Sequence, residues 1–379
     1  MTTTINNEHK KLNVPNSTDK GNVIRNVPHL RFPEFEGEWE KCKFKDVCNI
    51  STGNKNTQDK ADDGIYPFYV RSQTVERINS WTFDGEAILT AGDGVGVGKV
   101  FHHSYGKIGV HQRVYILSDF KCDANYLFHF FSSKFYNRVK RMSAKNSVDS
   151  VRKEMITDMP LSLPCHKEQV QIGHMLSLLD ERIATQSKII DKLQSLIKGI
   201  SSRIFASIQG IEYRMGDIVT ITNGNSNVQD AVTQSKEGLY PFFDRSEDIK
   251  YLPTFLFDKE AIIYPGEGTE FMPRYFKGKF ALHQRCYAIF DFNEIINARF
   301  LYFYLKTRNS YFVKNAVGST VPSLRLDTFQ KLKVIIPPTK TQHSVSSCLS
   351  SMEQKCNVEK KILHKLLKQK QYLLRQMFI

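Results

Sequence analysis

The stretch whose composition most suggests chemistry is GDGVGVGK, at residues 92–99. Glycine-rich loops that end in lysine can hold phosphates, but that pattern requires glycine where Asp93 stands and serine or threonine where Val100 stands. The related stretch PGEGTEFMPR, at residues 265–274, keeps only Gly266 and Gly268. We therefore expect a loop whose glycines permit positive φ or a close backbone approach, and not a nucleotide site.

The other reactive side chains form no catalytic or metal-binding pattern. His102, His103, His111 and His283 have no helical i, i+4 partner and no carboxylate–histidine pattern of the kind found in zinc sites. The seven cysteines include no C-x-x-C pair, which favours buried reduced thiols. The sequence has no nucleophile elbow and no Asn/Asp-Pro-Pro-aromatic motif for adenine methylation. We expect no metal and no catalysis in this chain.

The composition indicates several domains and an anionic partner. A length of 379 residues predicts two or more domains, and a hydrophobic fraction of 41% suffices for packed cores. No window approaches the run of about 18 apolar residues of a spanning helix, and the polar N-terminus lacks a signal core, so we expect a cytoplasmic protein. The net charge of +14 favours nucleic acid, although a basic surface without a specific partner has the same composition.

The chain repeats itself once, at an offset of about 173 residues. The matching segments are 43–56 with 213–227, 64–72 with 238–246, and 83–94 with 257–268. The tripeptide His111-Gln112-Arg113 recurs as His283-Gln284-Arg285. Each copy combines short β segments with one aromatic-rich helix, at residues 125–142 and 297–314, so the sequence predicts a tandem duplication of a mixed α/β domain.

Each copy ends in a long stretch with apolar residues at alternating steps of four and three. This period of 3.5 predicts two long helices that bury their stripes against each other as an antiparallel coiled coil, each about 60 Å long. The predicted seam comprises Ile172, Leu176, Leu179, Ile183, Ile190, Leu193 and Ile197, and then Val345, Leu349, Met352, Leu363, Leu366 and Leu373. Gln186, Glu359 and Lys370 are the polar exceptions.

The expected organisation is a pseudo-twofold dumbbell of two globular domains separated by the helical pair. Its predicted parts are a disordered tail at 1–25, a first domain at 26–165, a central helix at 166–206, a second domain at 207–338 and a C-terminal helix at 339–379.

This organisation resembles the specificity subunit of type I restriction–modification enzymes. The resemblance covers residues 27–379 and rests on the doubled unit, the entry phrase VPHLRFPEFEGEW, the F-D-x-E-A-I segments and the helix starts at Gln169 and Gln342. It implies that each domain is a target-recognition domain that reads one half of a bipartite, asymmetric DNA sequence. The helices would set the spacer and dock two modification subunits.

The resemblance also implies where the chemistry lies. S-adenosylmethionine would be bound by the modification subunits, and ATP and magnesium by two restriction subunits, while this chain would bind double-stranded DNA without a cofactor of its own. Two alternatives remain open. The chain could serve a fused restriction–methylation enzyme, or it could be a scaffold without DNA whose coiled coil recruits proteins.

The two copies also suggest which residues contact DNA. Residues identical in both cannot distinguish two half-sites, so we expect them to hold the fold or to bind phosphates. These pairs are Arg71 and Arg245, Lys107 and Lys279, Arg113 and Arg285, Lys140 and Lys314, and Arg152 and Arg325. For Arg113 and Arg285, a buried structural ion pair is an equal alternative.

Base readout is expected where the copies diverge in polar, loop-like sequence. The candidates are Lys99, His102, His103, Arg141, Lys145 and Asn146 in the first copy, and Arg274, Tyr275 and Lys277 in the second. Drift of loops that touch nothing would give the same divergence.

Overall fold

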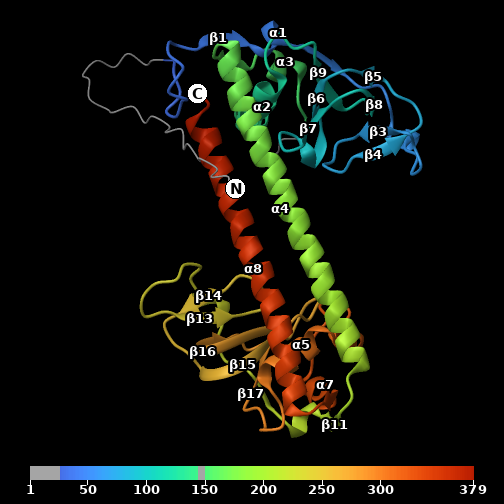
Figure 1. Cartoon of the computed structure of the whole chain (residues 1–379), viewed down its shortest axis with the longest axis vertical. Coiled ribbons are helices and arrows are strands. Elements are labelled where there is room, and N and C mark those ends of the chain that lie inside the picture. Colours follow the sequence, from blue (N-terminus) through green and yellow to red (C-terminus); the bar gives the residue numbers. More distant parts are fainter. Residues whose placement is uncertain (1–25, 144–149) are drawn as a thin grey trace, which may run out of the picture. The chain divides into compact units, whose positions relative to one another are not determined.

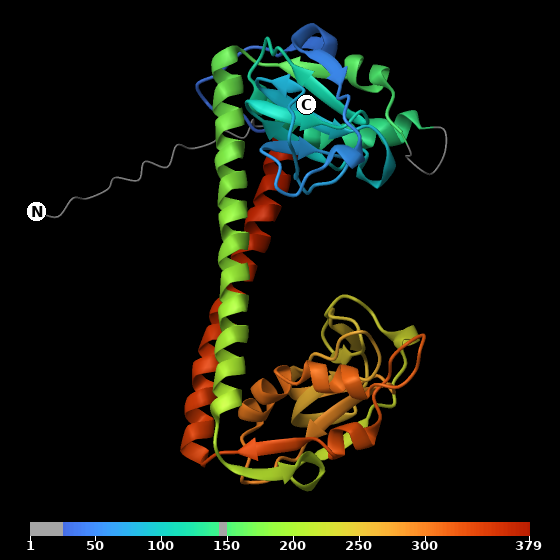
Figure 2. The same cartoon turned by 90° about the vertical axis from the view of Figure 1, so that its right-hand side faces the viewer.

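The computed structural model describes residues 26–143 and 150–379, which form two compact units (Figure 1, Figure 2). Unit 1 combines the chain up to Gln186 with Ile362–Ile379, and unit 2 is the continuous segment Ser187–Lys361. The predicted disordered tail and the candidates Lys145 and Asn146 lie outside the described residues.

Unit 1 contains two four-stranded sheets, in the orders β2-β9-β6-β7 and β4-β3-β8-β5, and the small pair β1-β10. Its strands are β1 (Glu40–Lys43), β2 (Asn49–Thr52), β3 (Tyr66–Tyr69), β4 (Glu76–Ile78), β5 (Phe83–Asp84), β6 (Ala87–Ala91), β7 (Phe101–Ser104), β8 (Lys107–Val110), β9 (Val114–Ser118) and β10 (Pro160–Leu163). Its helices, apart from the long ones, are α1 (Phe44–Val47), α2 (Ala124–Met142) and α3 (Lys153–Thr157).

Unit 2 has the same strand order in one six-stranded sheet, β12-β17-β15-β16-β13-β14, beside the pair β11-β18. Its strands are β11 (Ile211–Arg214), β12 (Thr220–Asn223), β13 (Tyr240–Phe243), β14 (Lys250–Leu252), β15 (Phe257–Pro265), β16 (Arg274–Leu282), β17 (Cys286–Phe290) and β18 (Lys333–Ile336). Its short helices are α5 (Ala298–Lys306), α6 (Asn309–Asn315) and α7 (Leu326–Gln330). The two units are therefore copies in topology as well as in sequence.

The two units differ at one strand, which is interrupted in unit 1 and continuous in unit 2. In unit 1, Gly85 has a φ of 141° and separates β5 from β6. Lys259 stands at the matching position in unit 2 and continues β15 without a break. This conformation is open to glycine and strained for lysine, so the substitution favours a single strand.

The aromatic helices start in the same way in both units. The Asp123 side chain accepts a hydrogen bond from the Tyr126 amide at 2.7 Å, and the Asn297 side chain accepts one from Phe300 at 2.9 Å. Both are N-caps that satisfy a free amide of the first turn.

The predicted helix at 297–314 is divided into α5 and α6. At the start of α6 the Asn309 side chain accepts a hydrogen bond from the Phe271 amide at 2.8 Å, which ties the preceding loop to the break. The matching residue of α2 is Phe135, which is fully buried, and α2 continues to Met142.

The long helices are α4 (His166–Ser207) and α8 (Thr339–Gln376), and each contributes one half to each unit. A buried glutamine ties the start of each to the neighbouring aromatic helix. The Gln169 amide accepts from the Asp123 backbone at 2.9 Å and donates to the Pro164 carbonyl at 2.8 Å. Gln342 makes the equivalent bonds, to Asn297 at 2.7 Å and Pro337 at 2.9 Å. We call this arrangement the glutamine clamp.

The far end of each long helix enters the core of a unit through a phenylalanine. Phe205 of α4 packs edge-on against Phe300 and Tyr304 in unit 2, with ring centroids 5.5 Å apart in both pairs. Phe378, which follows α8, packs edge-on against Tyr126 at 5.3 Å and Phe130 at 5.6 Å in unit 1. The residues in these contacts occupy equivalent positions in the two copies of the repeat, so the contact is duplicated together with the sequence.

All thirteen predicted seam residues are buried or half-buried. The exception Lys370 is explained within unit 1, because its ammonium lies 2.7 Å from the Asp180 carboxylate of α4. Leu373 of α8 and Met377, which follows α8, join Ile172 and Leu176 of α4 in the core of this unit.

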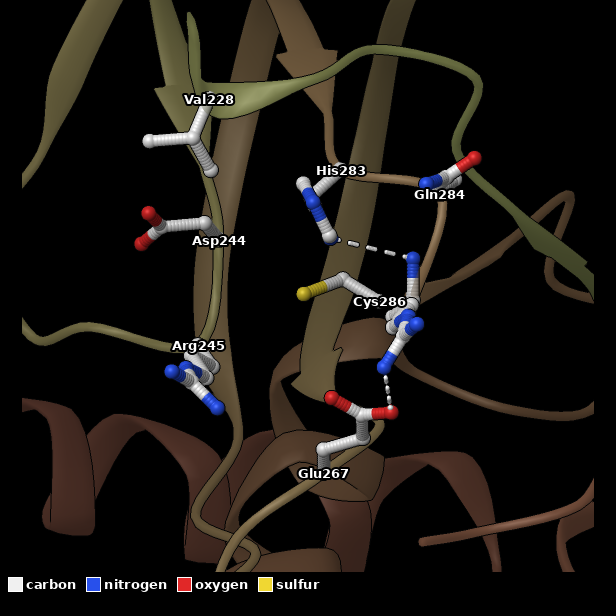
Figure 3. A pocket seen from close by; sticks show the side chains of 8 residues that line it. Val228, Asp244, Arg245, Glu267, His283, Gln284 and Cys286 are labelled. Atoms are coloured by element: carbon white, nitrogen blue, oxygen red, sulfur yellow. Dashed lines mark hydrogen bonds and ion pairs between the residues drawn. The ribbon is translucent and has the colours of Figure 1, made fainter.

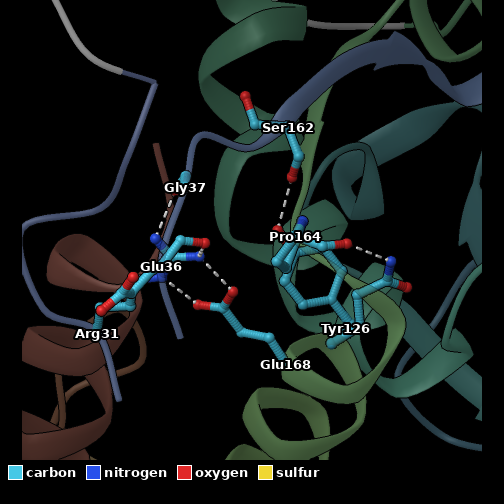
Figure 4. A network of polar contacts seen from close by, with 8 residues as sticks. Arg31, Glu36, Gly37, Tyr126, Ser162, Pro164 and Glu168 are labelled. Carbon is cyan, nitrogen blue, oxygen red and sulfur yellow. Dashed lines mark hydrogen bonds and ion pairs between the residues drawn. The ribbon is translucent and has the colours of Figure 1, made fainter. Parts of the chain in front are cut away.

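A buried ion pair fixes the segment that precedes β1 in unit 1 (Figure 4). The Glu168 carboxylate is fully buried, and the Arg31 guanidinium binds both of its oxygens, at 2.8 and 2.7 Å. Arg31 also donates to the carbonyls of Gly37 at 2.6 Å and Glu36 at 3.1 Å. A carboxylate in the core is tolerated here because its charge and its acceptors are both satisfied.

Candidate functional site

One pocket occurs at the same place in both units, and we call it the His-Gln-Arg pocket. In unit 1 its volume is about 410 Å³, and it is lined by Asn56, Thr57, Gln58, Arg71, Asp93, His111, Gln112 and Arg113. In unit 2 its volume is about 290 Å³, and it is lined by Val228, Asp244, Arg245, Glu267, His283, Gln284, Arg285 and Cys286 (Figure 3). Both linings contain the repeated tripeptide, a second arginine and one acid at matching positions.

The pocket forms where several strand ends meet. Arg71 follows β3 and His111 follows β8, and these two strands pair in parallel through Phe68 with Gly109 and Tyr69 with Val110. Asp93 follows the end of β6. In unit 2 the same positions follow β13, β16 and β15, with Phe242 and Phe243 opposite Ala281 and Leu282.

Glycines allow the strand ends to come this close. A β-carbon on Gly53 would lie 2.1 Å from the Val110 carbonyl oxygen, and one on Gly224 would lie 2.0 Å from that of Leu282. Such distances are sterically forbidden, so any other residue would push apart the two strand ends that form the pocket. A β-carbon on Gly92 would lie 2.9 Å from the Arg113 carbonyl oxygen, and one on Gly266 would lie 2.1 Å from that of Arg285. These two glycines belong to the glycine-rich segments in which a close backbone approach was expected.

The acid holds an arginine in each pocket. The Asp93 carboxylate lies 2.8 Å from Arg71 and 3.6 Å from Arg113, and Glu267 lies 2.5 Å from Arg285. The side chains of Arg113 and Arg285 are 64% and 63% exposed, whereas the two acids are 20% and 17% exposed. An ion pair forms at both positions, but it is not the buried pair expected as an alternative, because its guanidinium is exposed to solvent.

The histidines present a hydrogen-bond donor to the pocket. The Nδ1 atom of His111 accepts a hydrogen bond from the backbone amide of Arg113 at 3.0 Å, and that of His283 accepts one from Arg285 at 3.2 Å. The proton of the neutral ring is therefore on Nε2. Burial lowers the pKa of both histidines, and for His111 the nearby Arg71 lowers it further, so both rings are neutral donors at pH 7.

Unit 2 carries an additional acid in its pocket. Asp244 replaces Val70 of unit 1, and its carboxylate accepts from Lys250 at 2.6 Å and from the Ser246 amide at 2.8 Å. Burial raises the pKa of Asp244, but the hydrogen bonds from Lys250 and Ser246 outweigh it and hold that pKa below its usual value. In Figure 3, Asp244 and Arg245 lie on one side of the cavity and His283 and Gln284 on the other.

The other residues predicted to bind phosphates lie on the surface. Lys107 lies over the exposed ring of Trp81 at 5.1 Å, and Lys279 lies over Phe255 at 4.8 Å. These are cation–π pairs at matching positions of the two units. The remaining residues predicted to bind phosphates, Lys140, Arg152, Lys314 and Arg325, are also exposed.

The residues predicted to read bases divide into internal and exposed groups. His102 lies 3.1 Å from the Ser72 carbonyl and His103 lies 2.9 Å from Glu86, with only 12% of the His103 side chain exposed. Arg274 donates to the Asp244 carbonyl, and Tyr275 donates to Glu260. Each of these four side chains therefore forms a hydrogen bond within its own unit.

Lys99, Arg141 and Lys277 are exposed, with Lys99 5.6 Å from the ring of Tyr136. A role of any of these residues in reading bases stays a prediction.

The predicted DNA-binding residues omitted His111, Gln112, His283, Gln284 and the two acids Asp93 and Glu267 of the pockets. The acids could have been found from the sequence, because Asp93 and Glu267 occupy equivalent positions in the matched segments.

Among the described residues, no group of three or more acids, histidines and cysteines could hold a metal ion. No helix in the described part of the chain is long and apolar enough to cross a bilayer.

Comparison with known proteins gives consistent matches to one family. The family model for the "Type I restriction modification DNA specificity domain" matches residues 36–195 and 211–368. The chain is 26% identical over 161 residues to the type I restriction enzyme EcoDI specificity subunit of Escherichia coli, which covers 42% of this chain and 35% of that protein. It is 28% identical over 190 residues to the type I restriction enzyme MjaVIII specificity subunit of Methanocaldococcus jannaschii, covering 46% and 43%. The chain thus spans less than half the length of either relative.

Solved structures share the fold. The S subunit of a type I restriction–modification system from M. genitalium superposes with a TM-score of 0.71 at 17% identity, covering 93% of this chain and 99% of that one. A chain from a structure of type I restriction–modification complex assembly gives a TM-score of 0.50 at 14% identity, covering 90% and 97%. The family match covers most of the chain in two successive segments, so this protein belongs to the family of type I restriction–modification DNA specificity domains.

Proposed function

We propose that the chain is the DNA-specificity subunit of a type I restriction–modification complex. The observation that carries this proposal is the double family match, with residues 36–195 and 211–368 each containing one globular copy. The two relatives named above are specificity subunits, and the net charge of +14 suits a polyanionic partner.

In the proposed mechanism each unit reads one half of a bipartite DNA target. In this proposal the two recognition domains span residues 26–165 and 207–338, the limits predicted from the sequence. The long helices form an antiparallel coiled coil that sets the distance between the half-sites. A helix of about 40 residues spans about 60 Å, so the spacer is bounded at about 18 base pairs.

Catalysis belongs to other subunits in this proposal. Two modification subunits, which bind S-adenosylmethionine, dock on the helices, and two restriction subunits supply the ATP- and magnesium-dependent steps in the cytoplasm. This chain determines which DNA sequence is modified and carries no catalytic group for the reaction.

A domain exchange tests the proposal. Residues 207–338 are replaced by the corresponding part of another family member, and the methylome of cells that carry the chain with its modification subunit is sequenced. We expect one half of the methylated sequence to change while the other half and the spacer are kept. A change in both halves would contradict the modular assignment. Unchanged methylation after the exchange, together with DNA binding that does not weaken with salt, would favour the scaffold.

A further inference from the structure

We propose that the His-Gln-Arg pocket of each unit holds one phosphodiester of the DNA backbone, and this inference rests on the DNA-binding function proposed above. The pocket would act as an anchor that sets where each unit sits on the duplex. It would contribute affinity to both half-sites equally and carry no sequence information.

The first support is that the pocket is kept while its surroundings diverge. His111, Gln112, Arg113 and Arg71 are repeated without change, and Asp93 is replaced only by the equivalent acid Glu267. Two half-sites of different sequence share no ordered set of bases, but both have a phosphate at every step. A duplicated pocket that keeps these four residues therefore fits a ligand that is the same in both halves.

The second support is the kind of donors that converge on the pocket. Two guanidinium groups, a neutral histidine and a glutamine amide all line the cavity in each unit. In unit 1 the Gln112 amide also donates to Asn56 at 2.6 Å, and His111 Nε2 lies 3.4 Å from the Thr57 hydroxyl. A phosphodiester offers acceptors only, and charge-assisted bonds from arginine to phosphate are among the strong ones. The charge of the acid is balanced by arginines, because both oxygens of Asp93 lie near Arg71 and Arg113 in unit 1, and one oxygen of Glu267 binds Arg285 in unit 2.

The third support is a compensated charge change. The unit 1 pocket has two arginines and one acid, which leaves a formal charge of +1. In unit 2 the second acid Asp244 would cancel that charge, but Lys250 binds it at 2.6 Å and restores +1. The position that matches Lys250 in unit 1 is Glu76, since Phe68 pairs with Glu76 as Phe242 pairs with Lys250. The extra acid and the extra lysine thus occur together.

The test uses the full chain with its modification subunits and two duplexes, one with the target found in the methylome and one without it. Arg113→Ala removes the exposed guanidinium of unit 1, and Arg285→Ala that of unit 2. We expect each to weaken binding to both duplexes by the same factor, about tenfold for one charged hydrogen bond. The slope of log affinity against log salt should fall in magnitude by about 0.9 for each variant.

A chemical change in the DNA identifies the contact directly. Methylphosphonate linkages, which carry no charge, are introduced one at a time through each half-site. One linkage in the half read by unit 1 should weaken the wild-type complex as much as Arg113→Ala does. The two changes together should cause no further loss, because they remove the same contact. Combining the same linkage with Arg285→Ala should multiply the two losses.

Matched controls remove one cation elsewhere in the same unit. Lys43→Ala and Lys333→Ala each break an exposed ion pair, with Asp158 at 3.0 Å and Glu212 at 2.7 Å, in the small sheets β1-β10 and β11-β18. Both should leave the salt slope unchanged.

Three results would overturn the anchor. They are a loss confined to the target duplex, a changed base in the methylome, or a slope that falls equally in the controls. If instead the wild-type complex did not distinguish the two duplexes, the proposed function itself would fail.

Discussion

Replacing Arg31 with methionine should destabilise unit 1 strongly. The change removes the guanidinium that binds both oxygens of the fully buried Glu168 carboxylate, at 2.8 and 2.7 Å, and leaves that charge alone in the core. Removing one partner of a buried ion pair costs about 3 to 5 kcal/mol. Because the Arg31 side chain is 16% exposed and water can reach the vacated site, we expect about 3 kcal/mol.

The second half of this prediction is a rescue. Glu168→Met in the Arg31→Met background removes the unpaired charge and fills the space with an apolar side chain of similar length. Apolar replacements of a whole buried pair are often neutral or stabilising, so the double variant should return to within about 1 kcal/mol of the wild type.

Tryptophan fluorescence during urea unfolding measures this prediction in one unit. The chain has two tryptophans, Trp39 and Trp81, and both belong to unit 1. Trp39 is 3% exposed, so its emission reports the core that Glu168 borders. Lys43→Met, which breaks the exposed pair with Asp158, serves as a control and should leave the midpoint unchanged. A loss below about 1 kcal/mol for Arg31→Met, or a double variant no more stable than the single, would refute the reasoning.

Two further predictions concern buried polar side chains. Burial lowers the pKa of His129 to about 3. Between pH 6 and 4 this imidazole is therefore protonated in the unfolded chain and neutral in the folded chain. The wild type should therefore lose stability by up to about 1.4 kcal/mol per pH unit from this group, and His129→Gln should remove that part of the tryptophan-detected pH dependence; an unchanged dependence would exclude it. Gln169→Leu breaks the glutamine clamp of unit 1 and should lower the tryptophan-detected midpoint. Gln342→Leu should leave that midpoint unchanged and speed amide exchange in the first turn of α5; equal effects on both units would contradict the clamp's local role.

The duplicated architecture could be predicted because repetition and periodicity are properties of the sequence itself. The seam of α4 and α8 follows from the spacing of its apolar residues, and the matched segments place equivalent strands in equivalent sheets. The polar exception Lys370 could not be interpreted in advance. Its partner Asp180 lies 190 positions earlier in the chain, at a place that carries no local signal.

The candidate site was predicted only in part, because burial is decided by tertiary packing. His103 and Arg274 have side chains suited to base edges, and their divergence between the copies suggested readout. In the structure Glu86 binds His103, and Arg274 is half-buried and donates through Nη2 to the backbone of its own unit. Conversely, Asp93 and Glu267 stand in glycine-rich segments that suggested only a loop. Their role follows from the close approach of Gly92 to the Arg113 backbone and of Gly266 to the Arg285 backbone, which places each acid beside an arginine.

The division of the units along the chain sets an order of assembly during translation. Unit 2 is continuous from Ser187 to Lys361, so a nascent chain can close this core as soon as that segment has left the ribosome. Unit 1 begins earlier but needs Leu373, Met377 and Phe378 to complete its core. Domains usually fold in the order of their synthesis, N-terminal first. Here the unit that is started first must wait, with part of its apolar surface uncovered, until the unit that follows it has been made.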